Sequence, residues 1–332
     1  MQLKVTIIYN APQSGRYMAL GESLAEAGVL DEVNAVERAL LELRHSVFLL
    51  PLNPPLENTI DALKSIQADV IFNLFEGFDG EPGSEAAVAF ALEKLGIPFT
   101  GCPGSAIALA QDKVSIAAFL EQNGIPTPHY LVLGPSDIAE FKLAFPCIVK
   151  PVGEHASHGL SAESVVHDTS ALVTQVQRIS ARYSGKALVE EYIDGREFNA
   201  TVMGNKELTV LPISEIIFDL PPEVPKILTF AAKWVEGTIY FKGTKPFCPA
   251  GITDAQAQKI REMAMTIFRL AGCRGYARVD IRQDKNGVFR VIDINPNPDI
   301  SPEAGVDNQR RMTGMTYPEF IKKVVALALK RR

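Results

Sequence analysis

The first hundred residues alternate short apolar, β-branched runs with longer amphipathic stretches, and this pattern constrains the fold more than any other feature. Short apolar runs predict buried strands, and apolar residues at helical spacing predict helices between them. Strands that alternate with helices form parallel sheets. The expected strands are 3–9, 46–50 and 70–73, and the expected helices are 31–44, 59–67 and Ser84–Leu95, the last with Ser84 as its N-cap.

The sequence pattern changes twice after this segment, which divides the chain into three predicted domains at 1–101, 102–190 and 191–332. The second opens with a helix that Gly124 and Pro126 follow, and continues as a small α+β unit. In the third, residues 221–249 are rich in Pro, Gly and aromatic residues, which predicts a functional loop. The elements expected in the second domain are the helices Lys113–Gln122, 137–143 and 170–182 and the strands Tyr130–Leu133, 147–150 and 187–190.

Composition and missing motifs exclude several classes of protein. The chain has 33 basic and 39 acidic residues, a formal charge of −6, which offers nucleic acid no attractive surface. No apolar window is long enough to span a membrane and the N-terminus lacks signal-peptide features, so we expect a cytoplasmic protein with a small ligand. The four cysteines form no C-x-x-C pair, and the P-loop, dinucleotide-binding and hydrolase-elbow motifs are missing.

Two runs near the C-terminus, 276–281 and 288–295, predict a hairpin that carries charge on one face. Asn286-Gly287 favours a two-residue type I′ turn, and Asp194-Gly195 is a second hairpin signal. With that turn Asp280 lies opposite Asp293 and Arg278 lies opposite Asn295. Because side chains alternate along a strand, these four share one face. The other face is expected to be aliphatic, with Val279, Ile281, Ile292 and Ile294.

The two opposed carboxylates point to a cation site. Aspartates facing each other across a ladder, about 5 Å apart at Cβ, repel one another. A divalent cation between them reverses this interaction, and oxygen ligands suit Mg²⁺ or Mn²⁺, which also bind phosphates. The alternative from the residues alone is a solvated face on which Arg278 bridges the two acids.

Here the sequence resembles the ATP-grasp superfamily, and within it the D-alanine–D-alanine ligase branch. Arg278-x-Asp280 followed by Asp293-x-Asn295 is similar to the paired metal-binding strands of that family. Other segments match in order and spacing over nearly the whole chain, most weakly in the first seventy residues. These segments are Gln111-Asp112-Lys113, Ile148-Val149-Lys150-Pro151, the phosphate-covering loop 153–159, the adenine-binding region 189–198, and 247–250 at the close of a long loop.

The resemblance implies a three-domain ATP-grasp architecture of α/β and α+β type, with 1–101 as an N-terminal parallel α/β domain and 102–190 and 191–332 as the two ATP-grasp parts. It implies ATP and two Mg²⁺ or Mn²⁺ ions, the metal-binding residues being Asp280, Asp293 and Asn295. Arg278 and Lys233 would be catalytic. The nucleotide would be bound by Lys113, Lys150, Ser157, Glu190, Glu191, Ile193 and Glu197.

The implied activity is ATP-dependent ligation of a carboxylate to an amine, giving a dipeptide-type amide through an acyl phosphate, in a possible homodimer. The substrate positions depart from the D-alanine pattern. After the first strand, 9–16 contains no acid; the family's His-Gly is Glu76-Gly77, its loop Tyr is Trp234, and a small Gly is Asp299. We therefore expect altered amino-acid or peptide substrates, with Glu76 pairing with an ammonium group unless it lies in a solvated turn. The alternatives are a genuine D-alanine–D-alanine ligase, an ATP-grasp carboxylase and a non-catalytic nucleotide-binding protein.

Overall fold

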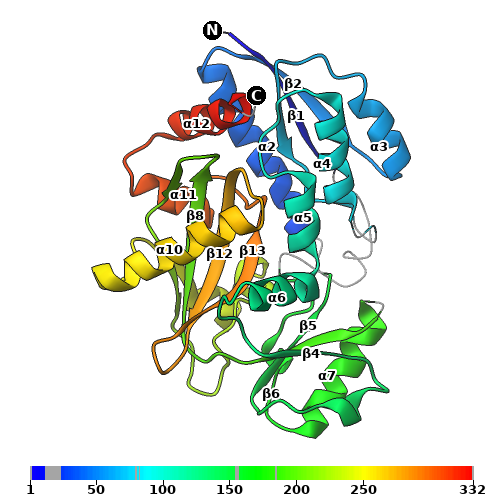
Figure 1. Cartoon of the computed structure of the whole chain (residues 1–332), viewed down its shortest axis with the longest axis vertical. Coiled ribbons are helices and arrows are strands. Elements are labelled where there is room, and N and C mark those ends of the chain that lie inside the picture. Colours follow the sequence, from blue (N-terminus) through cyan, green and yellow to red (C-terminus); the bar gives the residue numbers. More distant parts are fainter. Residues whose placement is uncertain are drawn as a thin grey trace.

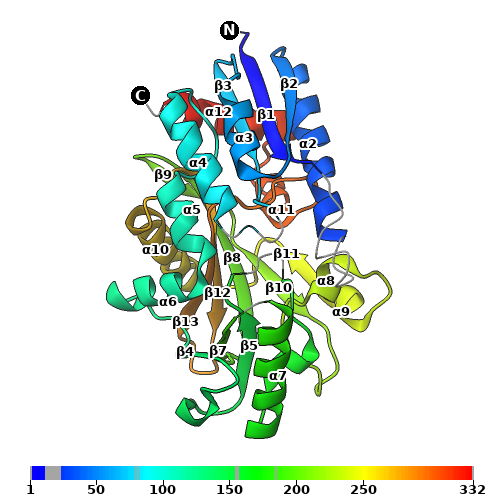
Figure 2. The ribbon, with the colours of Figure 1, turned by 90° about the vertical axis from the view of Figure 1, so that its right-hand side faces the viewer.

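The structure is a computed structural model, and it describes residues 2–11, 24–78, 81, 83–153, 157–183 and 185–330, with the backbone alone for 24–27. Its strands form three sheets (Figures 1 and 2). The N-terminal sheet lies at one end of the molecule and a four-stranded sheet at the other, with the largest sheet between them. Within the described ranges, no helix is long and apolar enough to cross a membrane.

The N-terminal sheet is parallel with the order β2-β1-β3, which confirms the predicted α/β class. The C-terminal helix α12 packs on the same core as β1, β3 and α2, so the two ends of the chain share one hydrophobic cluster. Ser84 is the first residue of its helix, not the cap; Gly83 holds the cap position, and the Ser84 hydroxyl accepts from the Phe78 amide at 2.8 Å. The elements are β1 (Lys4–Asn10), α2 (Leu24–Glu42), β2 (Ser46–Leu52), α3 (Leu56–Leu63), β3 (Val70–Leu74), α4 (Ser84–Leu95) and α12 (Tyr317–Leu329).

The four-stranded sheet is antiparallel with the order β4-β7-β5-β6, and α7 covers one face. The helix expected over 137–143 is wrong: only the 3-10 turn Ile138–Glu140 forms. The Asp137 carboxylate accepts from the Gly134 amide at 2.9 Å, a local bond that competes with a helix. The elements are β4 (Tyr130–Leu133), β5 (Cys147–Pro151), a second 3-10 turn (Ala162–Ser164), β6 (Val165–Val166), α7 (Thr169–Arg182) and β7 (Ala187–Glu191).

The largest sheet is antiparallel, with the order β11-β10-β8-β12-β13 and β9 paired to β8. Its apolar face packs against α10 and also against α5 and α6, which the sequence assigned to the domain beginning at 102. The predicted loop 221–249 contains two short helices and a strand. The elements are α5 (Gly104–Gln111), α6 (Lys113–Gln122), β8 (Arg196–Gly204), β9 (Leu208–Val210), β10 (Ser214–Phe218), α8 (Phe230–Trp234), α9 (Ile239–Gly243), β11 (Thr244–Phe247), α10 (Asp254–Leu270), β12 (Gly275–Gln283), β13 (Phe289–Asn295) and α11 (Gly305–Arg311).

The β12–β13 hairpin has the predicted acidic pairing but a different turn. The Asp284 amide donates to the Val288 carbonyl at 2.9 Å and closes a three-residue loop in which Gly287 has a φ of 81°. The prediction of a two-residue type I′ turn is therefore wrong. This turn shifts the ladder by one residue, and a bulge after Asp280 shifts it back. Asp280 therefore faces Asp293, and Arg278 faces Asn295, as expected.

The bulge changes which side chain of β13 enters the core. Val291 is fully buried with Val279, Ile281 and Ile294, whereas Ile292 is only half-buried and lies outside that cluster. The prediction that Ile292 lies on the core face is therefore wrong.

The second hairpin signal, Asp194-Gly195, is also wrong, because β7 and β8 belong to different sheets. Gly195 permits a close backbone approach instead: a Cβ at this position would lie 1.8 Å from the Gln283 carbonyl oxygen.

Candidate active site

The polar face of the largest sheet forms the centre of the site. Along β8 and β12 the side chains alternate, so apolar residues enter the core on one side. Charged and polar residues from the two strands oppose one another in three cross-strand pairs on the other side. The pairs are Glu197 with Arg282, Asn199 with Asp280, and Thr201 with Arg278.

Arg278 and Asp280 form a two-point ion pair on this face. Arg278 Nε lies 2.7 Å from Asp280 Oδ1 and Nη2 lies 2.9 Å from Oδ2. Asn199 Nδ2 also donates to Oδ1 at 2.7 Å. Burial opposes the charge of Arg278, but the neighbouring Asp280 carboxylate raises the pKa of the guanidinium. Asp280 is 8% exposed, whereas Arg278, Asp293 and Asn295 are half-buried; the pairing of Arg278 with Asp280 is the part of the alternative prediction that the structure contains.

Asp293 and Asn295 complete an oxygen-rich group on β13. Burial raises the pKa of Asp293, and the charges of Lys113 and Lys150 act against this shift. Both lysines therefore lie within electrostatic reach of Asp293. The described residues contain no group of three His, Cys, Asp or Glu side chains that could hold a metal. The set here is instead two carboxylates and one amide oxygen, a donor set that fits a hard divalent cation.

Lys150 and Glu190 form an ion pair on two neighbouring strands of the four-stranded sheet. Lys150 on β5 lies diagonally from Glu190 on β7, and Lys150 Nζ is 2.5 Å from Glu190 Oε2. Both side chains are largely buried. Both residues were expected to bind the nucleotide, but their pairing was not predicted from the sequence.

The connection after β7 presents backbone groups beside this pair. The Glu191 amide donates to the His129 carbonyl at 2.8 Å. The Ile193 carbonyl accepts from Arg282 Nη1 at 2.7 Å. Because these two groups already have partners, the Glu191 carbonyl and the Ile193 amide are the candidate backbone groups for hydrogen bonds to a ligand.

Lys233 and Trp234 lie on α8, within the predicted functional loop. Burial lowers the pKa of Lys233, as does the charge of Arg278, while the carboxylates of the polar face raise it. Lys233 thus lies within electrostatic reach of the polar face of the sheet. Trp234 packs towards α2, where a Cβ at Gly28 would lie 3.3 Å from its ring. Ser157, in the predicted phosphate loop, has a left-handed φ of 64°; Ala156 lies outside the described residues.

Glu76 lies within electrostatic reach of Lys233 and Asp299. The Glu76 amide is held by Asn10 Oδ1 at 2.8 Å, which joins the ends of β1 and β3. The Glu76 side chain is exposed, although neighbouring protein desolvates its carboxylate in part. Desolvation raises its pKa to about 7, helped by the charge of Asp299 and opposed by that of Lys233. Of the sequence motif 9–16, residues 12–16 lie outside the described residues.

Sequence reasoning missed four residues of this region: Glu32, Glu85, Asn199 and Arg282. Glu32 is 4% exposed on α2, and its carboxylate accepts from the Ile300 amide at 2.8 Å. Burial raises its pKa, and the charges of Asp299 and Glu76 add to the shift. A signal existed, because Glu32 interrupts an apolar helix stripe between Val29 and Val36.

Glu85 is a buried acid near Glu76, and its raised pKa predicts that the stability of the protein depends on pH. Burial raises its pKa to about 8, and the charge of Glu76 adds to the shift. The folded state therefore binds more protons than the unfolded state between pH 4.5 and 8, so the free energy of unfolding falls as pH rises through this window. In Glu85→Gln the fall between pH 5 and 8, measured by urea denaturation, should shrink by about 2–4 kcal/mol. Equal pH slopes in the two proteins would contradict this account.

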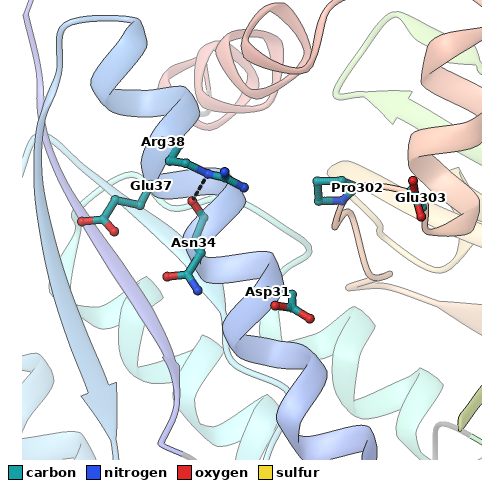
Figure 3. A pocket seen from close by; sticks show the side chains of 6 residues that line it. All are labelled: Asp31, Asn34, Glu37, Arg38, Pro302 and Glu303. Carbon is teal, nitrogen blue, oxygen red and sulfur yellow. Dashed lines mark hydrogen bonds between the residues drawn. The ribbon is translucent and has the colours of Figure 1, made fainter.

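A solvent-open hollow of about 630 Å³ lies apart from these groups, between α2 and the segment before α11 (Figure 3). Arg38 Nε donates to the Asn34 carbonyl at 3.3 Å at its edge. None of the predicted site residues lines this hollow, which is formed by Asp31, Asn34, Glu37, Arg38, Pro302 and Glu303.

The four-stranded sheet carries Lys150 and Glu190, and the largest sheet carries the hairpin with Asp280 and Asp293. These two antiparallel sheets together have the architecture of an ATP-grasp enzyme. The family model described as "D-ala D-ala ligase C-terminus" matches residues 119–326. The chain belongs to the D-alanine–D-alanine ligase family and is an ATP-dependent ligase.

Two relatives match most of this chain. The chain is 33% identical to the uncharacterized protein y4sG of Sinorhizobium fredii, over 90% of this chain and 87% of that protein. It is 30% identical to a D-alanine–D-alanine ligase of Alcanivorax borkumensis, over 94% of this chain and 98% of the other.

Solved structures share the fold. D-alanine–D-alanine ligase from Bacillus anthracis superposes with a TM-score of 0.74 at 19% identity, over 99% of this chain and 98% of that one. VanG D-Ala:D-Ser ligase from Enterococcus faecalis gives a TM-score of 0.74 at 20% identity, over 99% of this chain and 100% of that one.

Proposed function

We propose that this enzyme joins a carboxylate to an amine through an acyl phosphate, with amino-acid-like substrates on both sides of the bond. One observation carries the proposal. Lys233 lies within electrostatic reach of Arg278, Asp280 and Asp293 on the sheet, and also of Glu76, whose pKa the charge of Asp299 raises. This arrangement supplies cations for a phosphoryl group and, next to them, anions for an ammonium group.

For the nucleotide end, we assign Lys150 and Lys113 to the phosphates and Glu190 to the adenine amino group. The 2.5 Å contact between Lys150 and Glu190 keeps both charges compensated while they are buried. The Glu191 carbonyl and the Ile193 amide would take the edge of the ring, and Ser157 would cover the phosphates. Glu197 would accept from the ribose hydroxyls.

Asp280, Asp293 and Asn295 would hold one or two divalent ions against the phosphates. A bound Mg²⁺ or Mn²⁺ would neutralise phosphate charge and align the phosphoryl group. The residues of this chain provide the remaining charge: Arg278, already fixed by two bonds to Asp280, presents a rigid guanidinium beside the transferred group.

The reaction balances as follows. An oxygen of the substrate carboxylate attacks the γ-phosphorus of ATP, and ADP leaves. The amine of the second substrate then attacks the acyl carbon, phosphate departs, and the amine loses a proton. Arg278 and Lys233 stabilise the negative charge that develops in both steps. Trp234, packed towards Gly28, closes the loop against α2 and limits water, which would hydrolyse the acyl phosphate.

The amine substrate is the part for which we propose a departure from D-alanine. Glu76 follows β3 at the end of the N-terminal sheet, the usual ligand edge of an α/β domain, and Asp299 lies within electrostatic reach of it. A charged ammonium group between them would relieve their mutual repulsion. Curated relatives are named D-alanine–D-alanine ligase, so D-alanine itself is the second candidate substrate.

A panel assay tests the proposal. Phosphate release would be measured with ATP, Mg²⁺ and single or paired amino acids of both chiralities, with and without bicarbonate. We expect release to need two amino-acid-like substrates, with an amide product of matching mass. Release with D-alanine alone would support the second candidate. Dependence on bicarbonate would indicate a carboxylase, and nucleotide binding without turnover on the whole panel would contradict the proposal.

A further inference from the structure

Arg282 is a buried arginine that the proposed reaction does not use. It lies on β12, four residues after Arg278, and is 4% exposed. Removing a guanidinium from water is costly unless its donors are satisfied. Arg282 meets this condition by contacting three separate segments of the chain, so its position is closely determined.

The first contact is with Glu197, its cross-strand partner on β8. Arg282 Nε lies 3.0 Å from Glu197 Oε2, and Nη2 lies 2.7 Å from the same oxygen. Both bonds therefore end on Oε2. Among the described residues, no hydrogen bond to Glu197 Oε1 is found, and this oxygen is not among the buried unpaired atoms. The arginine holds the carboxylate by one oxygen and leaves the other for a ligand.

The other contacts join Glu197 to the segments around it. Arg282 Nη1 donates to the Ile193 carbonyl at 2.7 Å, and Nη2 also donates to the Lys226 carbonyl. The guanidinium lies 5.8 Å from the centre of the Tyr192 ring and 5.5 Å from that of Phe218. Two aromatic rings, one in the connection after β7 and one on β10, thus contact the guanidinium in addition to its hydrogen bonds.

We propose that Arg282 is a positioning residue for recognition of the nucleotide sugar: it orients Glu197 so that Oε1 accepts a hydrogen bond from a ribose 2′-hydroxyl. This inference rests on the proposed function, which places ribose at Glu197. A carboxylate that is free to rotate must be ordered when the ligand binds, whereas a carboxylate fixed in advance is not. Discrimination between ATP and 2′-deoxy-ATP therefore depends on Arg282, although Arg282 does not touch the sugar.

The test is the binding of ATP and 2′-deoxy-ATP, each with Mg²⁺ and without amino acids, measured by calorimetry. We expect the wild-type protein to prefer ATP by about tenfold or more, since a hydrogen bond to a charged group is lost with the deoxy sugar. In Arg282→Met the preference should fall to within about threefold, mainly through weaker binding of ATP. Glu197→Gln should lower the preference for ATP to a similar extent, and the double variant that combines Glu197→Gln with Arg282→Met should lower it no further.

Arg196→Met is the matched control. Arg196, the neighbour of Glu197 on β8, forms its own pair with Glu215 at 2.6 Å, so its loss perturbs the same sheet in a similar way. Its ATP preference should equal that of the wild type. Arg282→Lys keeps the charge, and its preference should lie between those of the wild type and Arg282→Met; this variant decides the matter if Arg282→Met does not fold.

Equal weakening of both nucleotides in the Arg282 variants, with the preference intact, would overturn the proposal, because a purely structural arginine gives that result. A wild-type protein that binds both nucleotides equally would overturn it as well. A wild-type protein that binds neither would instead refute the proposed function.

Discussion

Arg278→Lys should lower kcat about 1000-fold while the affinity for ATP changes little. The substitution keeps the positive charge but removes the planar fork that holds both oxygens of Asp280 at 2.7 and 2.9 Å. An arginine that stabilises a transferred phosphoryl group contributes about 10³–10⁵ to the rate. Steady-state phosphate release gives kcat, and calorimetry with ATP gives the affinity.

Arg310→Lys is the control for this experiment. Arg310 is also buried and bound to an aspartate, Asp307, at 2.7 Å, but it lies on α11, and Arg311 shares the same aspartate. Its kcat should stay close to that of the wild type. If Arg278→Lys retains kcat within tenfold, the guanidinium does not stabilise the reacting group and the assignment is wrong.

Glu76→Gln should raise the KM for the amino substrate by tens of fold, because the neutral amide cannot balance an ammonium charge. The loss of one charged hydrogen bond, about 1.5–3 kcal/mol, corresponds to this range. KM would be measured for the amino substrate at saturating ATP, once the panel assay has identified that substrate.

The pH profile separates this role from a structural one. The pKa of Glu76 is about 7, so its carboxylate gains a proton as pH falls below that value. In the wild type, KM for the amine should therefore rise as pH falls from 8 to 6, and in Glu76→Gln this dependence should disappear. Glu85→Gln, which alters a neighbouring buried acid, should keep it. An unchanged KM in Glu76→Gln would remove Glu76 from the substrate site.

Much of the fold could be predicted because it depends on local periodicity. The parallel N-terminal sheet and the helices at Ser84–Leu95 and Lys113–Gln122 follow from apolar spacing and from glycine or proline at their ends. The predictions failed where tertiary contacts decide. Asp194-Gly195 has the composition of a hairpin, yet the strands on its two sides belong to different sheets, and Gly195 lies too close to the Gln283 carbonyl for a side chain.

The site was predictable where one strand pair determines it. The predicted pairing of Asp280 with Asp293 is correct although the predicted turn is wrong, because the bulge after Asp280 compensates for the three-residue loop. The partners of these residues were not predictable. Asn199 and Arg282 contribute to the same face only because β8 lies beside β12. Residues paired across these two strands are about eighty positions apart in the sequence. Glu32 and Asp299 likewise come within electrostatic reach of each other only through the tertiary fold, and they are even farther apart in the sequence.

Oxygen-18 transfer tests the central claim most directly. The carboxylate substrate would be labelled in both carboxyl oxygens and incubated with the enzyme, ATP, Mg²⁺ and the amine substrate. If an acyl phosphate forms, one labelled oxygen passes to the phosphate in every turnover, and mass spectrometry of the released phosphate should detect it. Unlabelled phosphate formed together with amide product would contradict an acyl phosphate, and with it the mechanism proposed here.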